Sequence, residues 1–133
     1  MPAPDCLFVY GTLLSAVGHP MHRLLVHHAR LIGPAWYQGR LYQVDTYPGA
    51  VPSTRRADRV HGEIYRLLTA EPLLTRLDAY EQCSAAYPEP REYRRVADRV
   101  TLPDGQHSAC WIYLYNWPVA DRQRIPSGDF LQR

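Results

Sequence analysis

The chain has 133 residues, close to the commonest length of one domain, so we expect a single domain over residues 1–133. Hydrophobic residues make up 46% and charged residues 21%, which is ordinary for a globular protein. The formal net charge is only +2 and the basic residues are scattered, so no nucleic-acid partner is expected. No apolar run approaches the length needed to cross a bilayer, so no membrane partner is expected either.

Basic residues and cysteines exclude several chemistries. All 15 residues counted as lysine or arginine are arginine, which excludes a Schiff-base lysine and a P-loop lysine. The three cysteines, Cys6, Cys83 and Cys110, are far apart and form no CxxC, so neither a disulfide framework nor a zinc site is supported. The first residues lack a basic start and are interrupted by Asp5, unlike a signal peptide. These features favour a cytoplasmic protein with reduced thiols and no metal.

The opening apolar run, residues 7–10, predicts a buried strand that ends in a tight turn at Gly11 and Thr12. Gly11 has no Cβ, so it can adopt a positive φ and lets another molecule approach the main chain. A turn of this kind can direct several N–H groups into one space, where they would hold a carboxylate or an oxyanion. Taken alone, the stretch favours an ordinary strand end.

The next segment predicts a helix from Pro20 to the Gly33-Pro34 pair, with a rough apolar face that includes Leu31 and Ile32. Four histidines, His19, His22, His27 and His28, suggest a metal site. However, His22 and His27 are five residues apart and do not share a helical face, and no carboxylate or cysteine lies nearby. We interpret all four as surface residues.

Residues 35–44 and 59–68 predict strands, separated by a turn at residues 45–49. Thr69 then predicts the N-cap of a helix. Apolar residues recur at helical spacing along it: Leu73, Leu74, Leu77 and Tyr80.

The last third of the chain predicts a hairpin of strands over residues 91–102 and 108–115, after a loop over residues 83–90. Residues 116–133 are interpreted as a polar, irregular tail with a helical turn near Ser127. Helices alternate with mainly antiparallel strands, which favours an α+β fold with a curled sheet or small barrel and disfavours a doubly wound parallel sheet.

Glu81 stands out among the thirteen acids, most of which lie in turns or beside arginines, where charge pairing is the natural interpretation. It ends the second helix, four residues after Leu77 and so next to the buried face. Partial burial and the negative end of the helix dipole should raise its pKa towards neutrality. Such a group can take a proton and return it. Without further information, a surface glutamate at a helix end is the leading alternative.

Residues 9–13 (VYGTL) followed by residues 77–81 (LDAYE) resemble the γ-glutamylcyclotransferase-like, or AIG2-like, family, which includes γ-glutamylamine cyclotransferases and bacterial members. Six further stretches agree in order and rough spacing: GRLY at 39–42, YPGA at 47–50, VHGEIY at 60–65, YRR at 93–95, ACWIY at 109–113 and IPSGDF at 125–130. Together they span nearly the whole chain. They are specific for the family and not for one substrate.

The resemblance implies a small mixed, mainly antiparallel β-barrel with flanking helices and a cavity where the first turn faces the catalytic glutamate, which maps onto Glu81. The activity it implies converts a γ-glutamyl amine or γ-glutamyl amino acid to 5-oxoproline and a free amine. The α-amine attacks the γ-carbonyl, and Glu81 is the general acid and base. The small-molecule γ-glutamyl substrate is the expected partner, and no metal or organic cofactor is needed.

Candidate substrate-binding groups surround this glutamate. Main-chain N–H groups of Gly11, Thr12 and Leu13 are candidates for holding the substrate carboxylate or the oxyanion. Tyr10 could line the cavity or donate its hydroxyl, with core packing as the alternative. Tyr113, with Tyr115, could form an aromatic wall, although such alternation in a hairpin also fits plain core.

Two alternatives to the cyclotransferase remain open at this point. The family usually has glycine after the glutamate, and this chain has Gln82, which leaves room for a binding or regulatory module of the same fold that holds γ-glutamyl ligands without turnover. A cysteine hydrolase built on Cys83, with His61 or His107 as its base, is the second alternative, and no sequence spacing supports it.

Overall fold

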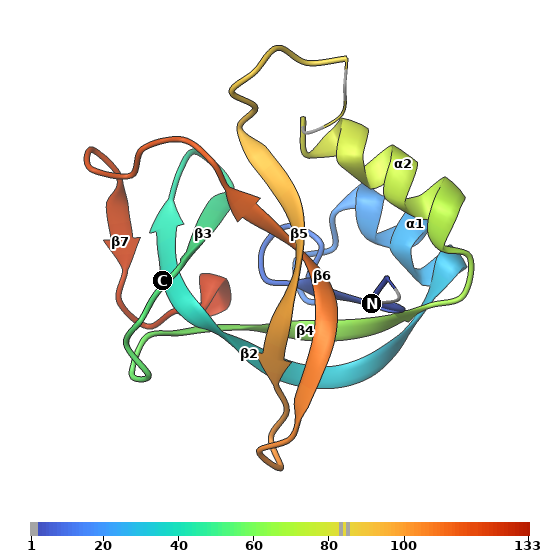
Figure 1. Ribbon diagram of the computed structural model, residues 1–133, viewed down its shortest axis with the longest axis horizontal. Coiled ribbons are helices and arrows are strands. Elements are labelled where there is room, and N and C mark those ends of the chain that lie inside the picture. Colours follow the sequence, from blue (N-terminus) through green and yellow to red (C-terminus); the bar gives the residue numbers. More distant parts are fainter. Residues whose placement is uncertain (1–2, 83, 85) are drawn as a thin grey trace.

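The computed structural model describes residues 3–82, 84 and 86–133, and its strands curl into a barrel with both α-helices on one side (Figure 1). In chain order the described elements are β1 (Cys6–Val9), α1 (Pro20–His28), β2 (Ala29–Gln43), β3 (Pro48–Pro52), β4 (Arg59–Leu67), α2 (Ala70–Tyr80), β5 (Tyr93–Thr101), β6 (His107–Tyr115), β7 (Gln123–Ile125) and a 3-10 helix (Phe130–Gln132).

The sheet closes on itself through β2. The strand order is β3-β2-β4-β1-β6-β5, and β2 also pairs with β5 where Trp36 faces Thr101. Five strands (β2, β4, β1, β6 and β5) therefore form a closed barrel. The β1–β6 pair is parallel and the other pairs are antiparallel. This confirms the predicted α+β fold with a small mixed, mainly antiparallel barrel.

β1 is the central strand, and all four of its residues are buried. It lies between β4 and β6, so neither of its edges is left unpaired. Gly62 on β4 permits a close approach at its end, because a Cβ there would lie 2.1 Å from the carbonyl oxygen of Val9. The residues after Val9 are thereby fixed against the barrel.

The first helix is shorter than predicted. It ends at His28, and residues 29–34 form the first part of β2, paired with β4. Leu31 and Ile32, which we had placed on a helical face, are exposed on the strand. Gly33-Pro34 does not end a helix; it lies inside β2, next to a register shift between Leu31 and Gly33. Pairing with β4 outweighs the local helical pattern here.

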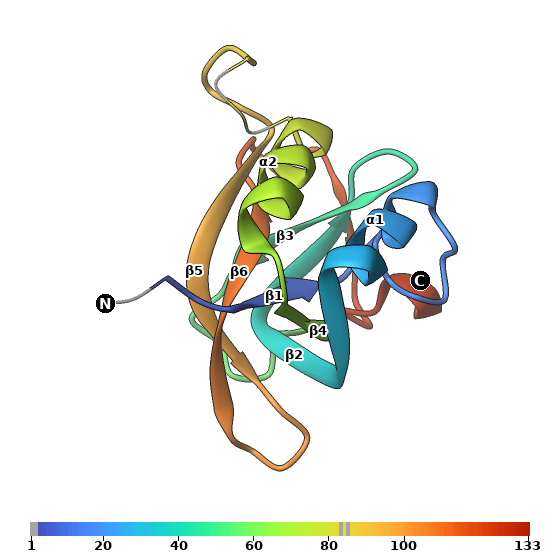
Figure 2. The same ribbon diagram turned by 90° about the vertical axis from the view of Figure 1, so that its right-hand side faces the viewer.

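The second helix matches the prediction, with Leu73, Leu74 and Leu77 buried. Thr69 occupies the N-cap position, but its hydroxyl makes no cap hydrogen bond and lies 2.5 Å from Nδ1 of His28. The two helices pack against each other, and Figures 1 and 2 show them side by side. Within the described residues, no helix is long and apolar enough to cross a bilayer.

Two strands fall where we predicted a turn and an irregular tail. β3 and β7 both pair with β2, at residues 39–43 and 41–43 respectively. Figure 1 shows them together, away from the helices. Ile125 of β7 and Phe130 of the 3-10 helix are buried. Burial of these two apolar side chains orders a segment whose other residues are largely polar.

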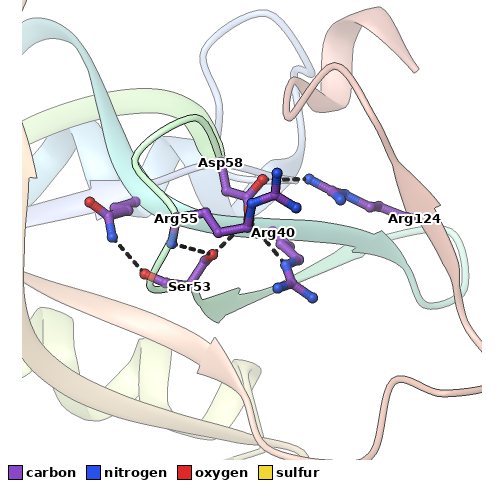
Figure 3. Close-up of polar contacts among 6 residues, drawn as sticks. Arg40, Ser53, Arg55, Asp58 and Arg124 are labelled. Carbon is purple, nitrogen blue, oxygen red and sulfur yellow. Dashed lines mark hydrogen bonds and ion pairs between the residues drawn. The ribbon is translucent and has the colours of Figure 1, made fainter.

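Asp58 fastens β7 and the loop after β3 to the barrel (Figure 3). Its carboxylate accepts hydrogen bonds from Ser53 Oγ at 2.6 Å, Arg40 Nε at 3.1 Å and Arg124 Nη2 at 3.0 Å. These donors, with Ser53 the strongest, lower the pKa of Asp58 to about 2.

We expect Asp58→Asn to destabilise the protein at neutral pH and to have little effect near pH 2. A carboxylate whose pKa is depressed by folding contributes stability above its unfolded value, and this contribution is lost as pH falls through about 2. Urea unfolding of both proteins between pH 7 and pH 2 measures the difference. Asp121→Asn, at an exposed loop position, is the control. If the difference in unfolding free energy between the wild type and Asp58→Asn does not shrink as the pH falls, the Asp58 carboxylate is not the source of this stability.

Candidate active site

A cavity of about 240 Å³ lies between the turn after β1, the start of β3, the C-terminal end of α2 and the neighbouring ends of β5 and β6. All of the predicted site residues line it: Tyr10, Gly11, Thr12, Leu13, Glu81 and Tyr113. The glycine-containing turn and the helix-ending glutamate, far apart in sequence, therefore share one hollow.

The turn after β1 is closed by a hydrogen bond from the Leu14 N–H to the Gly11 carbonyl at 3.0 Å. A turn of this kind can direct main-chain N–H groups into one space, as anion binding requires. Gly11 does not adopt the positive φ that we allowed for. Glycine is needed because a Cβ would lie 2.8 Å from Cγ of Pro48, across the cavity.

Glu63 on β4 holds the segment that follows the turn in place. Glu63 accepts hydrogen bonds from the N–H of Ser15 at 2.9 Å and from its hydroxyl at 2.7 Å. His22 Nδ1 lies 3.0 Å from the Leu13 carbonyl oxygen. The main chain of the turn is therefore fixed before any ligand arrives.

A chain of three side chains orients Thr12. Nδ1 of His19 accepts the N–H of Met21 at 3.0 Å, so Nε2 carries the proton of the neutral ring. That nitrogen lies 3.3 Å from the hydroxyl of Tyr80, which in turn lies 3.0 Å from Oγ1 of Thr12. With Nε2 donating to Tyr80 and Tyr80 donating to Thr12, the Thr12 hydroxyl can donate towards the cavity. His19, interpreted from sequence as a surface residue, therefore caps α1 and supports the cavity wall.

Tyr10 lines the cavity, but its hydroxyl is already engaged. It donates to the Tyr113 carbonyl oxygen at 2.5 Å and accepts the N–H of Ala50 at 3.2 Å. Burial raises the pKa of this hydroxyl far above its usual range. Of the roles we considered for Tyr10, the structure supports a place in the cavity wall and commits the hydroxyl to joining β1, β3 and β6.

Asp78 docks the C-terminal half of α2 on the barrel. It accepts Arg95 Nε at 2.8 Å, Arg95 Nη2 at 3.2 Å and the Tyr113 hydroxyl at 2.7 Å. The guanidinium of Arg95 also lies over the ring of Trp111. These contacts, made one helical turn before Glu81, fix the direction in which the helix end enters the cavity.

Glu81 is the C-cap residue of α2, and its N–H donates to the Leu77 carbonyl oxygen at 2.8 Å. The residue is partly exposed, where it borders the cavity. Burial of the carboxyl group, followed by the negative charges of Glu92 and Asp78, raises its pKa to about 8. The upward shift of the Glu81 pKa agrees with our expectation. The charges of Glu92 and Asp78 are two causes of this shift that the sequence did not indicate.

Gln82 follows with a φ of 56°, the only positive φ among the described non-glycine residues. This is the C′ position, where a left-handed conformation ends the helix and glycine is favoured. Gln82 therefore keeps the backbone path that the family's usual glycine would take, and it lines the cavity.

We expect Gln82→Gly to raise the free energy of unfolding by about 0.5–1 kcal/mol, because relief of the left-handed strain exceeds the added chain entropy of glycine. Gln82→Ala keeps the Cβ and should give no such gain. Chemical denaturation of the three proteins measures the effect. A loss of stability in the glycine variant would show that the Gln82 side chain contributes more than its backbone costs.

Glu92 is an acidic cavity residue that sequence reasoning missed. It lies between Arg91 and Tyr93, and we treated acids beside arginines as charge pairs. In the structure Arg91 pairs with Glu89 instead. Glu92 is only 7% exposed and accepts the Tyr47 hydroxyl at 2.7 Å.

Other expectations fall outside the cavity. Tyr115 does not line it; its ring packs where a Cβ on Gly49 would lie, and meets Tyr93 edge-on at a centroid distance of 5.4 Å. Cys83, the centre of the cysteine-hydrolase alternative, lies outside the described residues. His61 and His107 are exposed and line no part of the cavity.

A closed five-stranded mixed barrel with two helices, and an acid-lined cavity beside its first strand, define the class of protein. Residues 7–132 match the family model described as "Gamma-glutamyl cyclotransferase, AIG2-like". The chain is 34% identical over 128 residues to the gamma-glutamylcyclotransferase family protein YtfP of Escherichia coli K12, covering 96% of each chain.

Solved structures agree with this match. The solution structure of Escherichia coli ytfP superposes with a TM-score of 0.64 at 34% identity, covering 96% of this chain and 97% of that one. An AIG2-like protein from Mus musculus gives 0.69 at 25% identity, covering 90% and 82%. YkqA from Bacillus subtilis gives 0.71 at 26% identity, and this chain spans 39% of its length. The chain belongs to the gamma-glutamyl cyclotransferase, AIG2-like family.

Proposed function

We propose that this protein is a γ-glutamylcyclotransferase that converts a γ-glutamyl amine or γ-glutamyl amino acid to 5-oxoproline and the free amine. The observation that carries the proposal is the shared cavity of Glu81 and the turn at residues 11–13. A carboxyl group whose pKa is raised to about 8 there suits repeated proton transfer near neutral pH.

The reaction is an intramolecular acyl transfer. A bond forms between the α-nitrogen and the γ-carbon, and the bond from that carbon to the amide nitrogen breaks. Of the three protons on the substrate's α-ammonium, one stays on the ring nitrogen and two pass to the leaving nitrogen, which departs as an ammonium. Holding the substrate folded back can contribute up to about 10 kcal/mol to lowering the barrier.

In this proposal Glu81 transfers both protons in turn, as base towards the α-ammonium and as acid towards the departing nitrogen. The N–H groups of Gly11, Thr12 and Leu13 bind the substrate carboxylate or the developing oxyanion. Tyr10 and Tyr113 form walls of the cavity, and their hydroxyls hold its shape by binding the Tyr113 carbonyl and Asp78. No step calls for a metal or an organic cofactor.

Incubation with a panel of γ-glutamyl amines and γ-glutamyl amino acids, followed by measurement of 5-oxoproline, tests the proposal. We expect release of 5-oxoproline and amine in equal amounts from at least one class. Thermal shift with the same panel separates the alternative. A ligand that stabilises the protein, and never yields product, would identify a binding module of the same fold.

A further inference from the structure

Glu92 is a buried acid that lines the same cavity as Glu81. It lies immediately before β5, and its carbonyl oxygen accepts the Asn116 N–H at 2.7 Å, which fixes it where β5 and β6 meet the cavity. Both acids line the cavity, Glu92 from the position before β5 and Glu81 from the end of α2. Buried carboxylates are normally paired with a cation or with several donors.

Within the described residues, the Glu92 carboxyl group accepts one side-chain hydrogen bond, from the Tyr47 hydroxyl to Oε2 at 2.7 Å. Of the neighbouring arginines, Arg91 forms an ion pair with Glu89 and Arg95 forms one with Asp78. Among the fourteen described residues that line the cavity there are two glutamates and no arginine or histidine. The cavity is therefore built to receive a cationic group.

We propose that Glu92 binds the α-ammonium group of the substrate's γ-glutamyl portion, beside Glu81. This inference rests on the proposed function and adds to it a binding group for the primary ammonium. The γ-glutamyl portion carries a carboxylate and an ammonium on one carbon. The N–H groups of residues 11–13 complement the first of these groups, and Glu92 complements the second.

The same contact prepares Glu81 for its role. In the free protein Glu81 holds its proton at neutral pH, because its pKa is raised to about 8 by burial and by the charges of Glu92 and Asp78. An ammonium bound beside Glu81 favours the ionised form of its carboxyl group. Substrate binding therefore favours release of the Glu81 proton to solvent, which leaves a proton acceptor next to the nitrogen that must lose a proton.

Binding of two matched probes to a protein that cannot turn them over tests the proposal. The probes are γ-glutamyl methylamide and N-methylglutaramate, which lacks only the α-amine. In Glu81→Gln, where Glu92 is the remaining cavity carboxylate, titration calorimetry should show at least about tenfold tighter binding of the amine-bearing probe, as for a charge-assisted contact. If this protein binds the two probes with equal affinity, or binds neither, the proposal is overturned. This result needs no substitution of Glu92.

Variants then locate the contact. Glu81→Gln/Glu92→Gln keeps an acceptor for the Tyr47 hydroxyl, and should bind both probes within about twofold of each other. Glu81→Gln/Tyr47→Phe removes only that hydroxyl, and should retain the preference. If the tyrosine variant loses the preference as fully as the glutamine variant, Glu92 is a packing partner of Tyr47 and the proposal fails. Release of 5-oxoproline by the wild-type protein is measured separately. If product forms but the two probes bind equally well, the role of Glu92 is rejected and the proposed function is not.

Discussion

Glu81→Gln is expected to lower kcat for 5-oxoproline release by about 10²–10⁴-fold, because glutamine has the volume of glutamate and can neither accept nor donate the transferred proton. Asp78 and Leu77 still hold the end of α2, so the cavity should keep its shape. Steady-state assays with the best γ-glutamyl substrate give the comparison. Activity close to that of the wild type would remove Glu81 from the mechanism.

Stability provides the control for this variant. Folding raises the pKa of Glu81, so the folded protein holds its proton up to about pH 8 while the unfolded chain loses it at a lower pH. The free energy of unfolding therefore falls as pH rises towards 8. Above pH 8 the folded protein bears the full cost of holding Glu81 as a buried carboxylate. Glu81→Gln should be at least as stable as the wild type at pH 8–9. Glu71→Gln, at an exposed position in the first turn of the same helix, should keep full activity.

The second large effect is on the pH profile. If Glu81 must be ionised to accept the α-ammonium proton, kcat/KM should rise about tenfold per pH unit below pH 8 and level off near that value. Mixed buffers at constant ionic strength between pH 6 and 9 give the profile. Because the charge of Glu92 is one cause of the raised pKa, Glu92→Gln should move the rise to lower pH. A flat wild-type profile over this range would contradict an ionising Glu81.

Local patterns were sufficient where burial is decided within one element. Leu73, Leu74 and Leu77 repeat at helical spacing, so both the second helix and the place of Glu81 at its end followed from the chain alone. The apolar run of β1 and the glycine after it predicted the strand and the turn in the same way. Added to these, the family resemblance joined two stretches that no local argument connects, and the family match confirms it.

Local patterns misled where pairing partners compete. Leu31 and Ile32 fit a helical face as well as a strand, and only the presence of β4 alongside decides for the strand. The same holds for β3 and β7, which are short and gain their order from β2. Glu92 was overlooked because it stands beside Arg91 in the sequence, whereas its partner in the structure, Tyr47, is 45 residues away.

By itself, the sequence determined the family, the barrel class and the candidate acid, because residue periodicity and short motifs are properties of neighbouring residues along the chain. The tertiary structure decided how far the pKa of that acid is raised. The shift depends on exclusion of water and on the charges of Glu92 and Asp78, and these act through space once β5 and α2 have been brought to the same cavity.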